Sequence, residues 1–158
     1  MNASGGYIRW FKDIRLEDVP LVGGKTASLG ELYSTLAPHG VRVPNGFALT
    51  AGAYRDALTQ AGAWNELRKL ATGLDKRRIS DLARRAAAMR AIVYAATDQE
   101  ALRREVTEAY RKLEQEYGRN LAVAVRSSAT AEDLPNASFA GQHDSFRNIR
   151  GPRDLMDA

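Results

Sequence analysis

The chain has 158 residues, about one domain's length, a net charge of +4, and hydrophobic (44%) and charged (27%) fractions that argue against disorder or a fibrous class. It contains no cysteine, which excludes disulfides, thiolate metal sites and cysteine nucleophiles. The first residues have neither a basic segment nor an apolar run, and no apolar stretch is long enough to cross a bilayer, so we expect a cytoplasmic protein with no signal peptide and no membrane partner.

Two short strands and two helices are predicted near the N-terminus. Residues 7–11 (Tyr-Ile-Arg-Trp-Phe) predict a strand, and residues 47–49 (Phe-Ala-Leu) predict a second one. Between them, residues 22–25 form a tight turn, and apolar residues at helical spacing predict a helix over 26–36. Thr50 is placed to cap a further helix that begins after it.

The turn 23–26 reads Gly-Gly-Lys-Thr and invites comparison with the Walker A phosphate loop. That motif needs a glycine six residues before the lysine, where this chain has Val19, and a central strand before the loop, where Pro20 cannot donate a hydrogen bond. The Walker A interpretation therefore fails. A lysine at a helix start remains, and the Lys25 ammonium and free backbone N–H groups would together favour an anion. A turn shaped by packing is the alternative.

Basic residues are concentrated in residues 68–90. Clustered Lys and Arg could neutralise the phosphates of a nucleic acid. However, Asp81 is four residues from both Arg77 and Arg85, so local ion pairs account for part of the cluster. No aromatic residue lies within 65–93 to stack on bases. A solvated helix surface is the favoured interpretation, and we expect no nucleic-acid partner.

Two long helices are predicted in the middle of the chain. Ser80 is placed to cap the first, and a capping box over 97–100 is placed to open the second, which Gly118 ends. The apolar stripe of the first helix comprises Leu82, Ala86, Met89 and Val93. The inward positions of the second are Leu102, Val106, Tyr110, Leu113 and Tyr117.

An apolar, β-branched run over 121–125 predicts a buried strand, and residues 145–149 alternate like its partner. Arg126 ends the first strand. Burying its charged guanidinium there costs free energy unless the group is paired. Its planar fork of N–H donors suits phosphate oxygens. The alternative to a ligand is a salt bridge to a nearby carboxylate, namely Glu132, Asp133 or Asp144. The serines at 127–128 lack a Gly-x-Ser-x-Gly elbow, so we expect their hydroxyls to bond phosphate or the turn rather than act as nucleophiles.

The last residues predict a helix that begins at Gly151-Pro152, with proline in its favoured first turn. The chain stops about one and a half turns later, short of the length at which an isolated helix is stable. We therefore expect the chain to be the front of something longer.

Three segments resemble one family and occur in its order: residues 22–32, 43–50 and 125–142. From about Trp10 to its last residue the chain resembles the phosphoenolpyruvate synthase (pyruvate, water dikinase) family, within the pyruvate phosphate dikinase ATP-binding group. The resemblance implies an α+β fold in which residues 1–158 form the N-terminal portion of an ATP-grasp nucleotide-binding domain, truncated at its C-terminus. This portion would be helix-rich with a small mixed sheet.

The resemblance also implies four nucleotide-binding residues. Lys25 matches the helix-start lysine that contacts ATP phosphate, and Arg126 matches the strand-end arginine that holds the phosphates. Gly141 matches a glycine whose missing side chain lets the backbone approach the nucleotide. Ser145 stands where the family often has threonine, and His143 where glutamine is usual.

ATP is the implied ligand. Full-length members convert ATP, pyruvate and water to phosphoenolpyruvate, AMP and phosphate through a phosphohistidine, a step in pyruvate metabolism and gluconeogenesis. The Mg²⁺ ligands, the phosphohistidine and the pyruvate site lie further along such enzymes, and nothing here matches them. We therefore expect no catalytic residue and no metal ligand in this chain, which alone would be inactive. The front end of a rifampin-type antibiotic phosphotransferase and a non-catalytic nucleotide-binding module remain alternatives.

Overall fold

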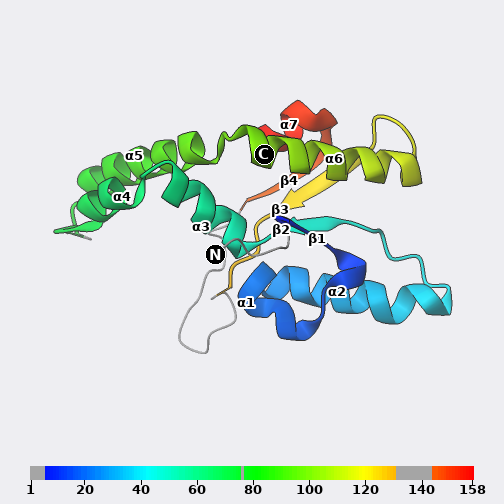
Figure 1. Ribbon diagram of the computed structural model, residues 1–158. Coiled ribbons are helices and arrows are strands. Elements are labelled where there is room, and N and C mark those ends of the chain that lie inside the picture. The colour runs from blue at the N-terminus through cyan, green and yellow to red at the C-terminus, as the bar shows by residue number, and fades with distance from the viewer. Residues whose placement is uncertain (1–5, 76, 131–143) are drawn as a thin grey trace. The chain divides into compact units, whose positions relative to one another are not determined.

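The computed structural model describes residues 6–75, 77–130 and 144–158 (Figure 1). Two compact units make up the chain, and each is described by itself. Unit 1 consists of Met1–Ala51 and Arg103–Ala158, and unit 2 of Gly52–Leu102. None of the helices in the described ranges is long and apolar enough to cross a membrane.

Unit 1 contains two sheets, each of two antiparallel strands. Both strand pairs were predicted as strands, but a mixed sheet was also predicted, and this is wrong for the described residues. A mixed sheet needs a strand with neighbours of opposite sense, whereas each described strand pairs with only one other. The pairs are β1 (Ile8–Trp10) with β2 (Phe47–Leu49), and β3 (Ala122–Arg126) with β4 (Ser145–Arg150).

The helices of unit 1 follow the sequence prediction closely. The helix predicted over 26–36 begins two residues earlier, the long second helix ends before Gly118 at φ +104°, and the last helix begins at Gly151. The helices are α1 (Val19–Val22), α2 (Gly24–Leu36), α6 (Glu100–Tyr117) and α7 (Gly151–Asp157). Three short 3₁₀ turns are η1 (Phe11–Asp13), η2 (Leu16–Asp18) and η3 (Ala37–His39).

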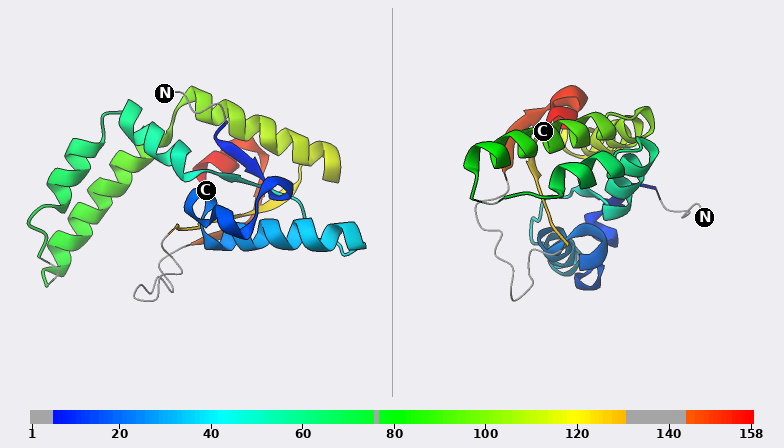
Figure 2. Two further views of the ribbon diagram at one scale, coloured as in Figure 1. Left: turned by 60° about the horizontal axis from the view of Figure 1, so that its bottom comes forward. Right: turned by 90° about the vertical axis from the view of Figure 1, so that its left-hand side faces the viewer.

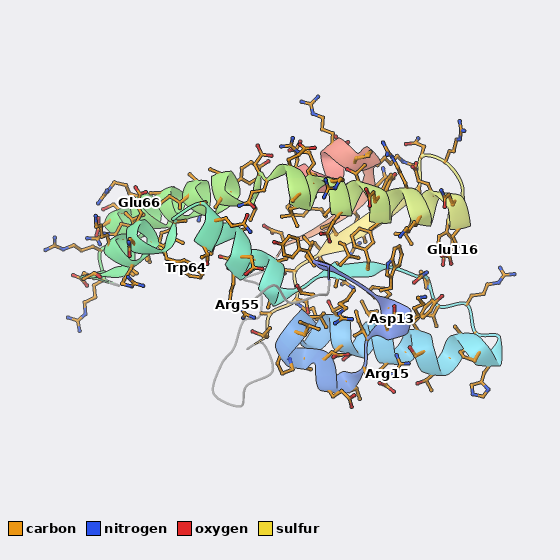
Figure 3. All side chains as sticks on the ribbon, in the orientation of Figure 1. Asp13, Arg15, Arg55, Trp64, Glu66 and Glu116 are labelled. Carbon is orange, nitrogen blue, oxygen red and sulfur yellow. The ribbon has the colours of Figure 1, made fainter. Side chains whose placement is uncertain are left out.

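The N-terminal core of unit 1 lies between α2 and the turns that precede it. Ile14, Val22 and Ala27 are buried together, and Gly30 lies so close that an added Cβ would be 2.5 Å from the Ile14 Cβ. The Arg15 guanidinium (Figure 3) donates to the carbonyls of Lys12 and Ile14 and, over 2.7 Å, to the Ser34 hydroxyl on α2. Apolar packing and these hydrogen bonds together hold α2 in place.

The other core of unit 1 forms under α6. The predicted inward positions are confirmed where the side chains are buried, at Val106, Tyr110 and Leu113 in unit 1 and at Leu102, the last residue of unit 2. Tyr117 is 46% exposed, so the prediction is wrong there. Tyr117 is the last residue of α6, and its hydroxyl accepts the backbone N–H of Asn45, in the loop before β2, at 2.8 Å. The Asn45 side-chain amide also donates to Glu116 (Figure 3) over 2.9 Å, which ties the loop before β2 to the end of α6.

Unit 2 is helical, and α4 and α5 lie side by side in it (Figures 1 and 2). Its helices are α3 (Ala51–Gln60), α4 (Trp64–Ala71) and α5 (Ile79–Thr97). The buried cluster comprises Leu58, Ala63, Leu67 and Ala96. Of the predicted α5 stripe, Met89 and Val93 pack against this cluster, whereas Leu82 is exposed.

Two predicted helix caps in unit 2 are wrong. Ser80 lies inside α5, which begins one residue earlier. Thr97 is the last residue of α5 rather than an N-cap, and its hydroxyl donates back to the carbonyls of Val93 and Tyr94, both at 3.1 Å. A threonine hydroxyl can bond either the N–H groups of the next helix or the carbonyls of its own preceding turn, and the Thr97 hydroxyl bonds the preceding turn. Gln99 then bonds the Ala96 carbonyl at the end of α5.

The basic segment of unit 2 is partly neutralised by local pairs. Asp81 accepts Arg84 at 2.6 Å and Arg85 at 2.8 Å, which confirms the predicted pair with Arg85 but not one with Arg77. Arg85 also donates to the carbonyls of Leu70 and Thr72, at the end of α4. Two of the basic side chains thus serve the helix pair itself.

We expect the Asp81 carboxylate to make the stability of unit 2 depend on pH. The hydrogen bond from Arg84 is the main cause that holds the pKa of the Asp81 carboxyl below its usual value of 3.8 in the folded chain. Because the folded pKa lies below the unfolded one, the stabilisation is present at neutral pH and is lost as the pH falls through the folded pKa. We expect Asp81→Asn to lower the urea midpoint at neutral pH, with a difference from wild type that shrinks below about pH 4.

Asp56→Asn on α3 is the matched control, and it should leave the urea midpoint unchanged at both pH values. If the urea midpoints of the wild type and Asp81→Asn differed by the same amount in acid and at neutral pH, the role given to the Asp81 charge would be contradicted.

Candidate functional site

The start of α2 packs against the segment that follows β3. Gly23 has φ +81° and ψ 161°, and a Cβ added there would be 2.3 Å from the Ser128 Oγ. The Gly24 N–H donates to the Ala129 carbonyl at 3.4 Å, and the Thr26 N–H to the Ser128 Oγ at 3.2 Å. We call these five residues the α2–β3 junction. It joins segments 102 residues apart in the sequence, both in unit 1.

Three of the four predicted site residues lie at or beside this junction. Lys25 is exposed and stands between the two donors, Gly24 and Thr26. Arg126 ends β3, two residues before Ser128. Ser145 begins β4 directly opposite Arg126. The fourth, Gly141, falls outside the described residues, as does His143.

Arg126 and Ser145 share one face of the β3–β4 sheet, because residues directly opposite in an antiparallel pair project to the same side. Ala122 and Ala124 alternate with the valines of β3 and lie on the Arg126 face, where both are exposed. Small side chains beside a cation and a hydroxyl leave room for a ligand to approach the strand.

The prediction that β3 is buried is wrong for the described residues. Only Val123 and Val125 are half-buried, and the face that bears Arg126 is exposed. The apolar run appeared buried on both sides, but Ala122, Ala124 and Arg126 are exposed, so only the face that bears the valines is partly covered. The Arg126 guanidinium is therefore a solvated cation rather than a buried one that must be paired.

Of the three carboxylates proposed as salt-bridge partners of Arg126, the structure describes one. Asp144 is described and makes no ion pair with Arg126. Glu132 and Asp133, the other two candidates, lie outside the described residues. Within the described part of the chain, the Arg126 guanidinium is available to a ligand.

The backbone N–H groups at the start of α2 were expected to be free, but two of them already have partners. Two of the first-turn donors of α2, at Gly24 and Thr26, already have acceptors in Ala129 and Ser128. The sequence allowed the serine pair to bond either phosphate or the turn, and Ser128 bonds the turn. The signal for this was Gly23, since only a residue without a Cβ fits there against Ser128.

A magnesium site does not fit these residues. Mg²⁺ prefers several oxygen ligands, usually carboxylates and waters. No group of three or more His, Asp or Glu side chains that could hold a metal occurs in the described ranges. The chemistry of the junction is that of cations and hydroxyls, which bind anions.

Comparison with known proteins decides the family. Residues 19–158 match the family described as "Pyruvate phosphate dikinase, AMP/ATP-binding domain". The chain belongs to this family. The assignment confirms the resemblance found in the three sequence segments and supports ATP as a ligand. All of the predicted site residues and the whole α2–β3 junction fall inside the matched range.

Curated relatives carry the name phosphoenolpyruvate synthase. The chain is 47% identical to the protein of Pseudomonas aeruginosa over 152 residues, which cover 96% of this chain and 19% of that protein. It is 45% identical to the protein of Helicobacter pylori over 151 residues, or 95% of this chain and 19% of the relative. The chain therefore spans about a fifth of the length of these two relatives.

Proposed function

We propose that this chain is the N-terminal portion of the ATP-grasp domain of a phosphoenolpyruvate synthase and that it holds the phosphates of ATP. The observation that carries the proposal is the placement of Lys25, Arg126 and Ser145 around one junction, although they come from three distant parts of the sequence. The curated relatives favour a synthase over a rifampin-type phosphotransferase or a non-catalytic module.

Each of the three side chains has a distinct part in binding. The planar Arg126 fork can donate two parallel hydrogen bonds to phosphate oxygens, whereas Lys25 acts as a compact point charge. The Ser145 hydroxyl donates a further bond beside Arg126. Gly141 would let the backbone approach the nucleotide. This set binds and orients a polyphosphate but does not itself move a phosphoryl group.

In the whole protein, we propose that ATP, pyruvate and water yield phosphoenolpyruvate, AMP and phosphate through a phosphohistidine, in the cytoplasm and in the service of gluconeogenesis. Pyruvate would bind to other parts of the enzyme. Phosphoryl transfer depends mainly on positioning and charge stabilisation. The part of this chain in that reaction is to fix the position of the ATP phosphates, and alone it is expected to be inactive.

Calorimetric titration with ATP tests the phosphate site. Charge-assisted hydrogen bonds are worth about 1.5–3 kcal/mol, so we expect Arg126→Ala to weaken ATP binding by about 10- to 100-fold. Arg42→Ala is the matched control, because Arg42 is an exposed arginine of unit 1 outside the junction. It should leave the affinity nearly unchanged. Equal affinities for Arg126→Ala and Arg42→Ala, or a folded wild-type chain that binds no ATP, would refute the proposed site.

A further inference from the structure

We propose that Ser128 is a positioning residue for nucleotide binding: its hydroxyl fixes the Lys25 end of α2 against the Arg126 end of β3. The inference rests on the proposed function of this site. It adds that the phosphates are held by side chains, because Ser128 and Ala129 occupy two of the backbone donors at the start of α2, the N–H groups of Thr26 and Gly24.

Ser128 contacts both sides of Lys25. Its Oγ accepts the Thr26 N–H, one residue after the lysine. Its Oγ and backbone carbon also lie where a Gly23 side chain would be, 2.3 and 2.6 Å from the position of an added Cβ. The lysine therefore sits on a turn whose position is set by one serine.

Ser128 is also close to Arg126 in the sequence, so the position of one constrains the position of the other. Only Ser127 separates them, and β3 is held in its sheet by pairing with β4 up to Arg126 itself. A shift of Ser128 relative to α2 would therefore change the spacing between the Lys25 ammonium and the Arg126 guanidinium. Two cations that grip one polyphosphate must keep that spacing within a fraction of an ångström.

Two backbone N–H groups at the start of α2 are not available to bind an anion. The Thr26 N–H is buried with its residue, which is 9% exposed, and it already donates to Ser128. The Gly24 N–H, also buried, donates to the Ala129 carbonyl. Free N–H groups are what makes a helix N-terminus an anion site, and these two are engaged.

Two models therefore make opposite predictions for Ser128→Ala. If Ser128 positions Lys25, loss of the hydroxyl loosens the junction and weakens ATP binding. If the helix start is the true phosphate site and Ser128 merely blocks it, the same change frees the Thr26 N–H and tightens ATP binding. Ser28→Ala is the matched control, because it removes an exposed hydroxyl of α2 that lies outside the α2–β3 junction.

The experiment is ATP titration of the wild-type protein and of Ser128→Ala, Ser28→Ala, Lys25→Ala and the Lys25→Ala/Ser128→Ala double variant. We expect Ser128→Ala to weaken binding about fivefold, and Ser28→Ala to have no effect. In the Lys25→Ala background the effect of Ser128→Ala should nearly vanish, because the lysine that it positions is gone. A purely structural role would weaken binding equally in both backgrounds.

Tighter binding by Ser128→Ala, unchanged binding, or an equal loss in both backgrounds would overturn the role of Ser128. These outcomes are separate from failure of the proposed function, which the wild type and Arg126→Ala report. Should Ser128→Ala fail to fold, Ser128→Cys keeps the shape of the side chain with a weaker acceptor, and it should show the same loss that depends on Lys25.

Discussion

Gly23→Ala should lower the free energy of unfolding by about 2–6 kcal/mol. At φ +81° and ψ 161° Gly23 occupies a backbone region that is almost exclusive to glycine, which accounts for about 1–3 kcal/mol. The new Cβ would also lie 2.6 Å from the backbone carbon of Ser128, which cannot rotate away. Forcing that contact open costs about another 1–3 kcal/mol. Urea unfolding measures the change.

Gly40→Ala is the control with positive φ but no close contact, at ψ 7° rather than 161°. Gly40 also has positive φ, at +79°, but an added Cβ would meet nothing within 4 Å. It lies in the same unit and should cost only the backbone strain, about 1–2 kcal/mol. If Gly23→Ala were no more destabilising than Gly40→Ala, the close contact with Ser128 would not exist in solution. Because that contact belongs to the α2–β3 junction, Gly23→Ala should also weaken ATP binding in whatever fraction remains folded.

Tyr110→Phe should lower the free energy of unfolding by about 2 kcal/mol. The Tyr110 side chain is fully buried, and its hydroxyl donates to the Leu121 carbonyl at 2.7 Å and accepts the Gly151 N–H at 2.9 Å. Phenylalanine fills the same space but leaves both backbone groups without their partner. These groups flank the β3–β4 sheet at the start of β3 and the end of β4, so the pairing that carries Arg126 and Ser145 should open more often.

Amide hydrogen exchange provides the second measurement for Tyr110→Phe, with faster exchange expected in β3 and β4 than in α2. Tyr54→Phe is the control, because Tyr54 is 46% exposed and lies in unit 2. Unchanged exchange in β3 with an unchanged urea midpoint would show that the Tyr110 hydroxyl does not hold the sheet.

Most secondary structure could be predicted because its causes are local. Apolar spacing placed α2 and α6, and glycine ended α6 at Gly118 with φ +104°. The cap at Ser80 failed because α5 begins one residue before it. The cap at Thr97 failed because a hydroxyl next to a helix end has two possible partners. Sequence patterns do not indicate which one is closer, and Thr97 bonds its own preceding turn.

The site was only partly predictable. Lys25, Arg126, Gly141 and Ser145 came from motifs that resemble a family, and their role in ATP binding stays a prediction. Ser128 was no more than a candidate hydroxyl, because its acceptor role depends on a helix start 102 residues away. The exposed face of β3 was missed because a run of valine and alanine is apolar on both sides whether or not anything covers it.

The sequence by itself determined the family, the strands and most helix boundaries of this chain, because these depend on residue types at short spacing. Only the tertiary structure decided that Gly23 and Gly24 meet Ser128 and Ala129, that Arg126 faces Ser145, and that two of the backbone donors at the start of α2 are already engaged. The physical reason is that such contacts join segments far apart in the chain. Their geometry follows from how the packed elements meet, which no local pattern encodes.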